Sequence, residues 1–292
     1  GTFGKDPAKR ADFAHRAQHV TAVAAKALIQ AFYGQPQRYA YFSGCSDGGR
    51  EALIEAQRYP EDFNGIIAGA GALNFIVQNA VFHAWQARAN VGADGKPVLL
   101  AARLPLLHAA VITACDALDG LEDGLISNPL VCRFDPAILQ CPAAANDTSA
   151  CLTAAEIAVV RKLYDGPRDA ATGTSLTPGG PQYGSELAWA GVYVPEAADG
   201  AIFSEKVSLP VLRNMVFAPD PPADFALADL HFDLATFQKL RLRHRLFDAT
   251  NPDLGAFADT GGKLMLWHGW SDPHISPINS LEIGRASCRE RV

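Results

Sequence analysis

The feature that most constrains the fold of this chain is a serine flanked by glycines, between two segments of different periodicity. Residues 41–49 read YFSGCSDGG, which places Ser46 in a G-x-S-x-G pattern directly after Cys45. The segment before it, Arg38 to Gly44, is short and rich in aromatic residues, as in a buried strand. The segment after it, Arg50 to Pro60, has helical periodicity and ends at a proline. Strand, turn and helix is the context in which this pattern holds a nucleophilic serine on a sharp turn.

The chemistry of such a turn follows from its backbone. The serine has strained dihedral angles, and the flanking glycines are required because a Cβ would collide with the neighbouring strand or helix. The backbone N–H of Asp47 begins the following helix, where the helix dipole favours negative charge, so we expect it to be an oxyanion donor. The second donor is expected in a loop after an earlier strand, upstream of Gly1. The alternative is a structural serine in a glycine-rich loop.

Further segments predict an α/β fold with a mostly parallel sheet and helices on both faces. Residues 12–33 have helical spacing, and Gly65 to Gly71 is apolar throughout, as in a strand covered on both sides. Lys263 to Trp267 is a further apolar strand. The region between them has helical pieces, cysteines and proline-rich stretches but few convincing strands. We therefore expect a core of residues 1–72 and 251–281 that is interrupted by an insertion of residues 73–250.

The last residues differ from the rest. Residues 283–292, IGRASCRERV, have no periodicity and resemble the translation of a sequencing adapter, so residues 282–292 are predicted to be foreign. In that case the natural reading frame was cut near Ser280, and Cys288 has no native partner. A genuine basic tail is the alternative.

The acid and base of a catalytic triad should follow in the order Ser, Asp/Glu, His. Asp272 lies in the loop after the strand at 263–267, and the alternative is that Asp272-Pro273 is only a turn. His274 is two residues away on the same loop, too close to bond the carboxylate and the serine together. His268 is expected to pack within the loop. The catalytic histidine is therefore expected beyond the end of this chain.

Composition excludes some classes of function. The chain has 292 residues, a net charge of −6 and no internal run of basic residues, which argues against a nucleic-acid partner. No apolar stretch approaches the roughly 18 residues of a membrane span. The cysteines between positions 115 and 151 have no zinc spacing and indicate disulfides in an oxidising compartment, with buried reduced thiols as the alternative.

Four segments resemble the tannase/feruloyl esterase family, which also contains the mono(2-hydroxyethyl) terephthalate hydrolases. They are DFAHRAQHVTAVAAKALIQAFYG, YFSGCSDGGREALIEAQRYPEDFNGIIAGAGALNF, CDALDGLEDGLISNPLVCRFDP and LMLWHGWSDPHISP, in this order. The similarity extends from about residue 12 to residue 277. It implies an α/β-hydrolase core with a lid domain in the insertion.

The resemblance also assigns roles to the cysteines and to an acidic loop. It implies that Cys45 pairs with a cysteine beside the catalytic histidine, that Cys115 pairs with Cys132, and that Cys141 pairs with Cys151. Five genuine cysteines agree with a lost partner. The resemblance implies a lid calcium site, and the residue types fit it, with carboxylates and carbonyls as oxygen ligands: Asp116, Asp119, Asp123, Leu121 and Leu125. A solvated acidic loop is the alternative.

The implied function is a secreted or periplasmic serine esterase that cleaves small-molecule esters of aromatic acids, with little turnover by this chain itself. Two alternatives stay open. One is a binding module stabilised by calcium and disulfides that lacks the triad, and the other is a broad carboxylesterase. Trp189 and Phe217 could line an aromatic pocket, but we expect both to be core residues.

Overall fold

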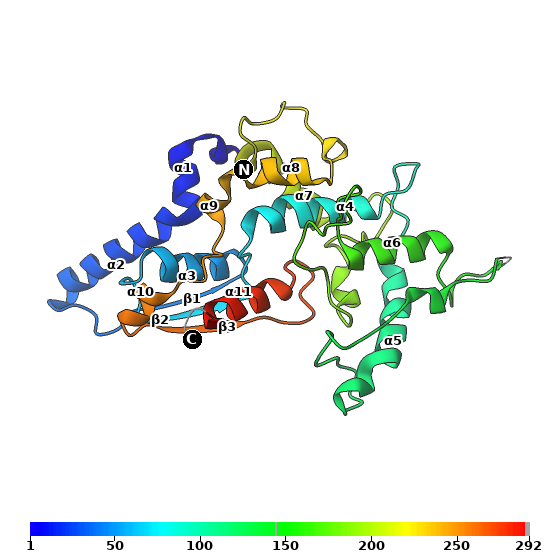
Figure 1. Cartoon of the computed structure of the whole chain (residues 1–292), viewed down its shortest axis with the longest axis horizontal. Helices are drawn as coiled ribbons and strands as arrows, with labels where there is room; N and C mark the ends of the chain where they lie inside the picture. The colour runs from blue at the N-terminus through cyan, green and yellow to red at the C-terminus, as the bar shows by residue number, and fades with distance from the viewer. Residues whose placement is uncertain (144, 290–292) are drawn as a thin grey trace.

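A computed structural model describes residues 1–143 and 145–289, without the side chains of 288 and 289. Figure 1 shows a small parallel sheet with helices above it, and a largely helical part of the insertion, around α5 (Leu104–Cys115) and α6 (Ala154–Asp165) and here called the lid for its predicted role, that extends to one side. The strands are β1 (Tyr41–Cys45), β2 (Gly65–Gly69) and β3 (Lys263–Trp267). The α-helices are α1 (Pro7–Ala11), α2 (Ala17–Tyr33), α3 (Asp47–Arg58), α4 (His83–Ala89), α5 (Leu104–Cys115), α6 (Ala154–Asp165), α7 (Phe203–Val211), α8 (Leu234–Leu240), α9 (His244–Phe247), α10 (Gly255–Asp259) and α11 (Ile278–Arg289).

The sheet has the order β1-β2-β3, and both pairs of strands are parallel. Cys45 is opposite Gly69, which is in turn opposite Trp267, so the three strands end at the same edge. The chain crosses from β1 to β2 through α3, which packs on both strands. This is the α/β arrangement that the sequence predicts, and it brings Ser46 and the loop after β3 to one edge of the sheet.

One face of the sheet is exposed, which corrects the expectation that both faces are covered and that the first strand is buried. α3, α10 and α11 cover one face through a shared apolar core that includes Leu53, Phe257 and Ile283, and Figure 1 shows α2 and α3 above the strands. The other face presents four large apolar side chains that are 40–71% exposed: Tyr41, Ile67, Met265 and Trp267. Successive side chains of each strand point to opposite faces of the sheet, so apolar residues lie on both faces. Within the described residues, helices pack against only one of these faces.

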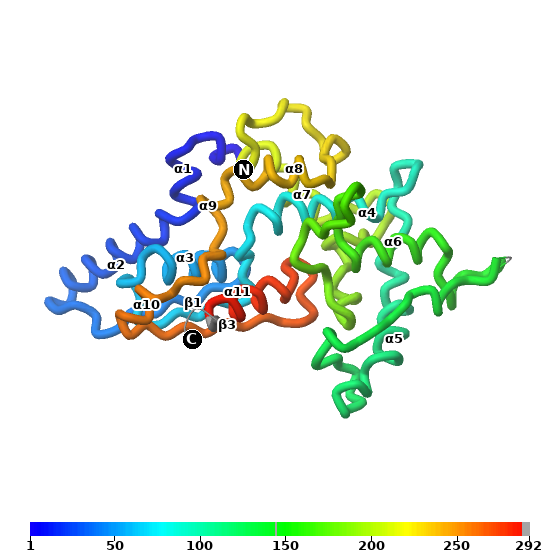
Figure 2. The backbone as a smooth tube through the Cα atoms, in the orientation of Figure 1, coloured from blue at the N-terminus to red at the C-terminus, as the bar shows by residue number. Residues whose placement is uncertain are grey.

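The insertion contains two apolar cores of its own. The lid core lies around α5 and α6 and includes Trp189, which is fully buried, as expected. The second core joins Ala14 to residues between 75 and 247, so it connects the insertion to the first part of the chain, and Phe217 packs on its edge. Figure 2 shows the chain leaving the sheet through α4, turning through α5 and α6, and returning through α7, α8 and α9.

The helical stretch Ala101–Asp119, which contains α5, is apolar and long enough to cross a membrane by length and composition. The sequence expectation that no stretch approaches such a span is therefore corrected. Composition alone is weak support for a span, because core helices have the same property. Leu104, Leu107 and Val111 of this helix are buried in the lid core.

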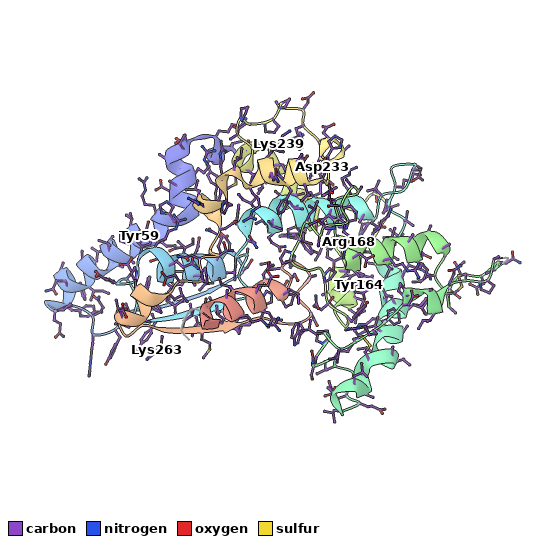
Figure 3. The ribbon with its side chains drawn as sticks, in the orientation of Figure 1. Tyr59, Tyr164, Arg168, Asp233, Lys239 and Lys263 are labelled. Carbon is purple, nitrogen blue, oxygen red and sulfur yellow. A yellow bond between two sulfur atoms is a disulfide. The ribbon has the colours of Figure 1, made fainter. Side chains whose placement is uncertain are left out.

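Aromatic side chains help to hold the helices in place, and Figure 3 labels one in each region. In the α/β region, the ring of Tyr59 stacks on His19 of α2 with centroids 4.1 Å apart, and its hydroxyl is 2.7 Å from Nδ1 of His15. In the lid, the hydroxyl of Tyr164 donates to the buried carboxylate of Glu186.

The chain end forms a helix where the sequence shows no periodicity. α11 begins at Ile278, and Ile283 packs in the same core as Leu53 of α3, on the covered face of the sheet. Residues 290–292 of the predicted tail lie outside the described residues. The foreign origin of residues 282–292 stays a prediction.

Candidate active site

Ser46 lies on a strained turn between β1 and α3. Its backbone has φ 63° and ψ −120°, a conformation that L-residues rarely adopt. Backbone hydrogen bonds hold the turn on both sides: Ser46 N–H donates to Gly69 O at 3.0 Å, and Ala72 N–H donates to Ser46 O at 3.1 Å. Strain that the surroundings maintain in this way is typical of functional sites.

The glycines near Ser46 have different roles. A Cβ on Gly44 would lie 2.1 Å from the carbonyl oxygen of Gly48, and one on Gly49 would lie 2.3 Å from that of Gly69. A Cβ on Gly48 would meet nothing within 4 Å. The expectation that steric collision requires both glycines of the motif is therefore right for Gly44 and wrong for Gly48. The second close approach, of α3 to β2, occurs at Gly49.

Asp47 is the first residue of α3, so its N–H has no acceptor within the helix and lies at the positive end of the helix dipole. Its side chain is held by Arg50, whose Nε donates to Asp47 Oδ1 at 2.7 Å. The Arg50 side chain is fully buried. It also donates to the carbonyl oxygens of Ala14, Phe13 and Phe247. The position of the predicted oxyanion donor is therefore tied to two separate segments of backbone, at residues 13–14 and at Phe247.

Asp272 lies in the loop after β3, and its carboxylate has several partners. Oδ2 is 3.1 Å from Nε2 of His268, and Oδ1 accepts the N–H groups of His274 and Ile275. Burial raises the pKa of Asp272, but the hydrogen bond from His268 and the two backbone N–H groups outweigh it, so the pKa is lowered. The carboxylate is thus favoured in its charged form.

His268 is more than a packing residue of the loop. Its side chain is 5% exposed, and its Nε2 is also 3.0 Å from the carbonyl of Ile275, while Nδ1 is 2.7 Å from Ser280 Oγ. Both ring nitrogens are therefore engaged, Nε2 by the loop and Nδ1 by the first turn of α11. In the described part of the chain, no histidine is hydrogen-bonded to both Asp272 and Ser46.

His274 lies near Ser46 but does not link it to Asp272. Its backbone N–H donates to Asp272 Oδ1 at 2.8 Å, and its carbonyl accepts from Gln78. Its ring packs edge-on against Phe203, with centroids 4.5 Å apart. The ring is therefore turned toward the insertion and away from the position of a triad base.

A cavity of about 480 Å³ opens at Ser46, and we call it the acyl cavity. Its size is in the range of small-molecule sites. The polar residues in its wall are Ser46, Asp47, Asn79, His83 and His274. The other lining residues are Gly1, Phe3, Phe13, Ala72, Phe75, Phe203, Val207, Pro210, Val211, Met215 and Ile275. Trp189 and Phe217 are not among them.

The predicted calcium loop follows α5. Its carboxylates accept backbone N–H groups of the loop: Asp116 from Gly124, Asp119 from Leu121 and Ser127, and Asp123 from Leu125. Hydrogen bonds from Ser127 and Leu121 lower the pKa of Asp119. In the described residues, no three His, Cys, Asp or Glu side chains converge as a metal site. Asp116 Oδ1 is buried without a hydrogen-bond partner, an oxygen that a cation would satisfy.

The cysteines form the two lid disulfides that the resemblance implies, Cys115–Cys132 and Cys141–Cys151. The first disulfide closes the acidic loop at the end of α5. Cys45 is exposed and is a free thiol in the structure. Its pairing with a cysteine beside a catalytic histidine stays a prediction.

The sequence reasoning missed Arg50, His83 and Phe203. Arg50 follows the glycine pair directly, but α3 has several other charged residues, so no local signal distinguishes Arg50 from them. His83 and Phe203 are 120 positions apart, and only the packing of α4 on α7 brings them together.

A parallel α/β sheet with a strained serine turn at its edge, an aspartate in the loop after a later strand and a large insertion is typical of the α/β-hydrolase class. The family profile described as "Tannase and feruloyl esterase" matches residues 1–286. The chain belongs to this family.

Similar proteins agree with this assignment. A probable feruloyl esterase of Arthroderma benhamiae is 32% identical over 94% of this chain and 50% of its own length. The mono(2-hydroxyethyl) terephthalate hydrolase of Piscinibacter sakaiensis is 31% identical over 96% of this chain and 53% of its own length. The crystal structure of feruloyl esterase B from Aspergillus oryzae superposes with a TM-score of 0.83 at 28% identity, covering 99% of this chain and 55% of that one. The chain thus spans about half the length of these relatives.

Proposed function

We propose that this chain carries the nucleophile and the orienting acid of a carboxylic-ester hydrolase for esters of phenolic acids, of feruloyl or galloyl type. The observation that carries the proposal is the strained turn of Ser46 at the mouth of a largely apolar cavity. The names of the similar proteins, feruloyl esterase among them, support the substrate class.

In the proposed reaction, Ser46 Oγ attacks the ester carbonyl carbon, and the carbonyl oxygen becomes an oxyanion that accepts the N–H of Asp47. The serine proton passes to a histidine base and then to the leaving alcohol, which departs as the acyl–Ser46 ester forms. Water then attacks this ester and releases the acid. Asp272 orients the histidine and stabilises it while it is positively charged.

A non-catalytic binding module is the second candidate, and one observation favours it. The Asp272 carboxylate is satisfied by His268 and two backbone N–H groups, and no histidine in the described residues joins it to Ser46. Both functions use the same cavity, so turnover distinguishes them.

We expect the chain alone to hydrolyse methyl ferulate slowly, because a triad without its base retains only oxyanion stabilisation and binding. Added imidazole should raise the rate of the chain above that of the Ser46→Ala variant in the same imidazole, since a free base can then accept the serine proton. The measurement is ferulic acid release at several imidazole concentrations, and the Ser46→Ala variant corrects for direct catalysis by imidazole. Equal rates for the two proteins at every concentration would contradict the role of Ser46 and favour the binding module. Rapid Ser46-dependent turnover without imidazole would show that a base is already present.

We also propose that the loop after α5 binds a structural calcium ion through the side chains of Asp116, Asp119 and Asp123 and the carbonyls of Leu121 and Leu125. Each carboxylate oxygen that accepts an N–H keeps a second lone pair for an ion. A bound ion would hold the loop that the Cys115–Cys132 disulfide closes.

Calcium is expected to raise the melting temperature of the chain, because an ion that binds only the folded state stabilises it by mass action. The Asp116→Asn variant should lose most of this shift, as measured by thermal denaturation in calcium and in chelator. Asp147→Asn is the matched control, since Asp147 also accepts a backbone N–H two residues on, in another lid loop. An equal calcium response in all three proteins would refute this site.

The disulfides of the lid support export of the protein to an oxidising compartment, outside the cell or in the periplasm.

A further inference from the structure

Two histidines from distant parts of the chain lie together in the wall of the acyl cavity. His83 begins α4, and His274 belongs to the loop after β3. Their ring centroids are 6.3 Å apart, and Phe203 of α7 contacts both, with centroids 5.5 Å from His83 and 4.5 Å from His274. The proposed mechanism assigns no role to either imidazole.

The imidazole of His83 is fixed and neutral. The residue is 2% exposed, and its Nδ1 is 2.9 Å from Ser204 Oγ. Burial, with a smaller effect from His274, lowers the pKa of His83 to about 3 against an opposing effect of Asp272. A neutral imidazole has one donor and one acceptor nitrogen. Within the described residues no hydrogen bond engages Nε2, so one polar atom of the ring is left for a ligand.

His274 adds a second polar atom at the same place. Its Nδ1 is buried and has no hydrogen-bond partner in the described residues. Its main chain is held on both sides, by Asp272 and by Gln78. Burial lowers the pKa of His274, and the charge of Asp272 only partly opposes this. The shift favours the neutral ring, and the main chain that carries it is held in place before any ligand binds.

Unpartnered nitrogens in an apolar wall cost free energy unless a ligand satisfies them. The chemistry of the ligand group follows from their neutrality. A carboxylate only accepts hydrogen bonds, so it cannot satisfy a ring nitrogen that carries no proton, and an alkyl or unsubstituted aromatic group would leave both nitrogens without partners. A phenolic hydroxyl is neutral near pH 7 and can both donate and accept, so it fits either tautomer of the histidines.

We propose that His83, oriented by Ser204, and His274 bind the ring hydroxyl of a phenolic acyl group and select hydroxylated over unsubstituted aromatic esters. The inference rests on the proposed function, because it takes the acyl cavity to be the substrate site. It adds the residues that recognise the phenol and makes Ser204 a positioning residue.

The test compares methyl 4-hydroxycinnamate with methyl cinnamate, which differ only in the ring hydroxyl. Binding to the 292-residue Ser46→Ala variant is measured by calorimetry, so no turnover is needed. We expect the hydroxylated ester to bind about 10-fold more tightly, as for one or two net hydrogen bonds. The ratio of the affinity for the hydroxylated ester to that for methyl cinnamate should fall to near 1 when His83→Phe is added, whereas His83→Gln should retain part of the preference. The ratio should not change between pH 7 and pH 8, because both imidazoles are neutral there: the pKa of His83 is about 3, and burial lowers the pKa of His274 below its ordinary value.

Further variants separate the outcomes. Ser204→Ala removes the partner of His83 with a minimal change in volume, so it tests the inference even if His83→Phe fails to fold, and it should lower the ratio. His108→Phe is the control, since His108 pairs with Glu186 in the lid, away from the cavity, and it should leave the ratio unchanged. The inference would be overturned if the parent protein bound the two esters with equal affinity. It would also be overturned if Ser204→Ala and both His83 variants left the ratio of the two affinities intact. In either case the esterase proposal would still stand. Failure to bind either ester would contradict the esterase proposal itself.

Discussion

Replacement of Arg50 by methionine is expected to lower the free energy of unfolding of the chain by about 3–5 kcal/mol, as for a buried charged group whose partners are left behind. The guanidinium is fully buried and donates to three backbone carbonyls and to the Asp47 carboxylate. It also lies over the rings of Phe13 and Phe75 at 5.4 and 5.3 Å. Methionine can fill the space but cannot donate to the carbonyls, and each unsatisfied carbonyl costs about 1–3 kcal/mol.

Urea denaturation followed by circular dichroism measures this loss, with Arg16→Met as the matched control. Arg16 pairs with Asp12 in an exposed position, so its replacement should change the stability little. Arg50→Lys should be intermediate, because a lysine keeps the charge but not the forked geometry. If Arg50→Met were as stable as the control variant, the hydrogen bonds from Arg50 to the backbone carbonyls would contribute little. The contact of α3 with residues 13–14 and Phe247 would then depend on apolar packing alone.

The Gly44→Ala substitution is expected to destabilise the chain by about 3 kcal/mol, the upper part of the range for overpacking. Its Cβ would lie 2.1 Å from the backbone oxygen of Gly48, and backbone cannot move aside as a flexible side chain can. Either β1 or the start of α3 must shift, so the Ser46 turn should distort as well.

Gly48→Ala is the paired control, on the other side of the same serine. A Cβ there meets nothing within 4 Å, and alanine is favoured over glycine in a helix, so stability should be unchanged or rise by up to about 1 kcal/mol. Equal losses for the two variants in urea denaturation would show that the turn depends on glycine flexibility rather than on close contact.

The local architecture around Ser46 could be predicted because the signals are local. A short strand, a glycine-flanked serine and a periodic helix follow one another directly over residues 41–58, and each is specified by near neighbours in the chain. The loop of Asp272 was predictable for the same reason, since it follows an apolar strand directly. The role of His268 was not, because its contacts with Ser280 and Ile275 depend on how the loop folds back.

The wall of the acyl cavity could not be read from the sequence. His83, Phe203 and His274 meet through the packing of α4, α7 and the loop after β3, and no periodicity encodes that meeting. Coverage of the sheet was mispredicted for a related reason. Apolar residues on both sides of a strand indicate that both faces can be packed, whereas the sequence pattern does not state what lies against each face.

The open face of the sheet has a practical consequence for handling the isolated polypeptide. This face has an exposed apolar patch, and such patches promote aggregation of the protein. The patch consists of Tyr41, Ile67, Met265 and Trp267. Recombinant material should be prone to precipitation, and dilute samples, mild detergent or charged substitutions at these positions are the remedies to try first.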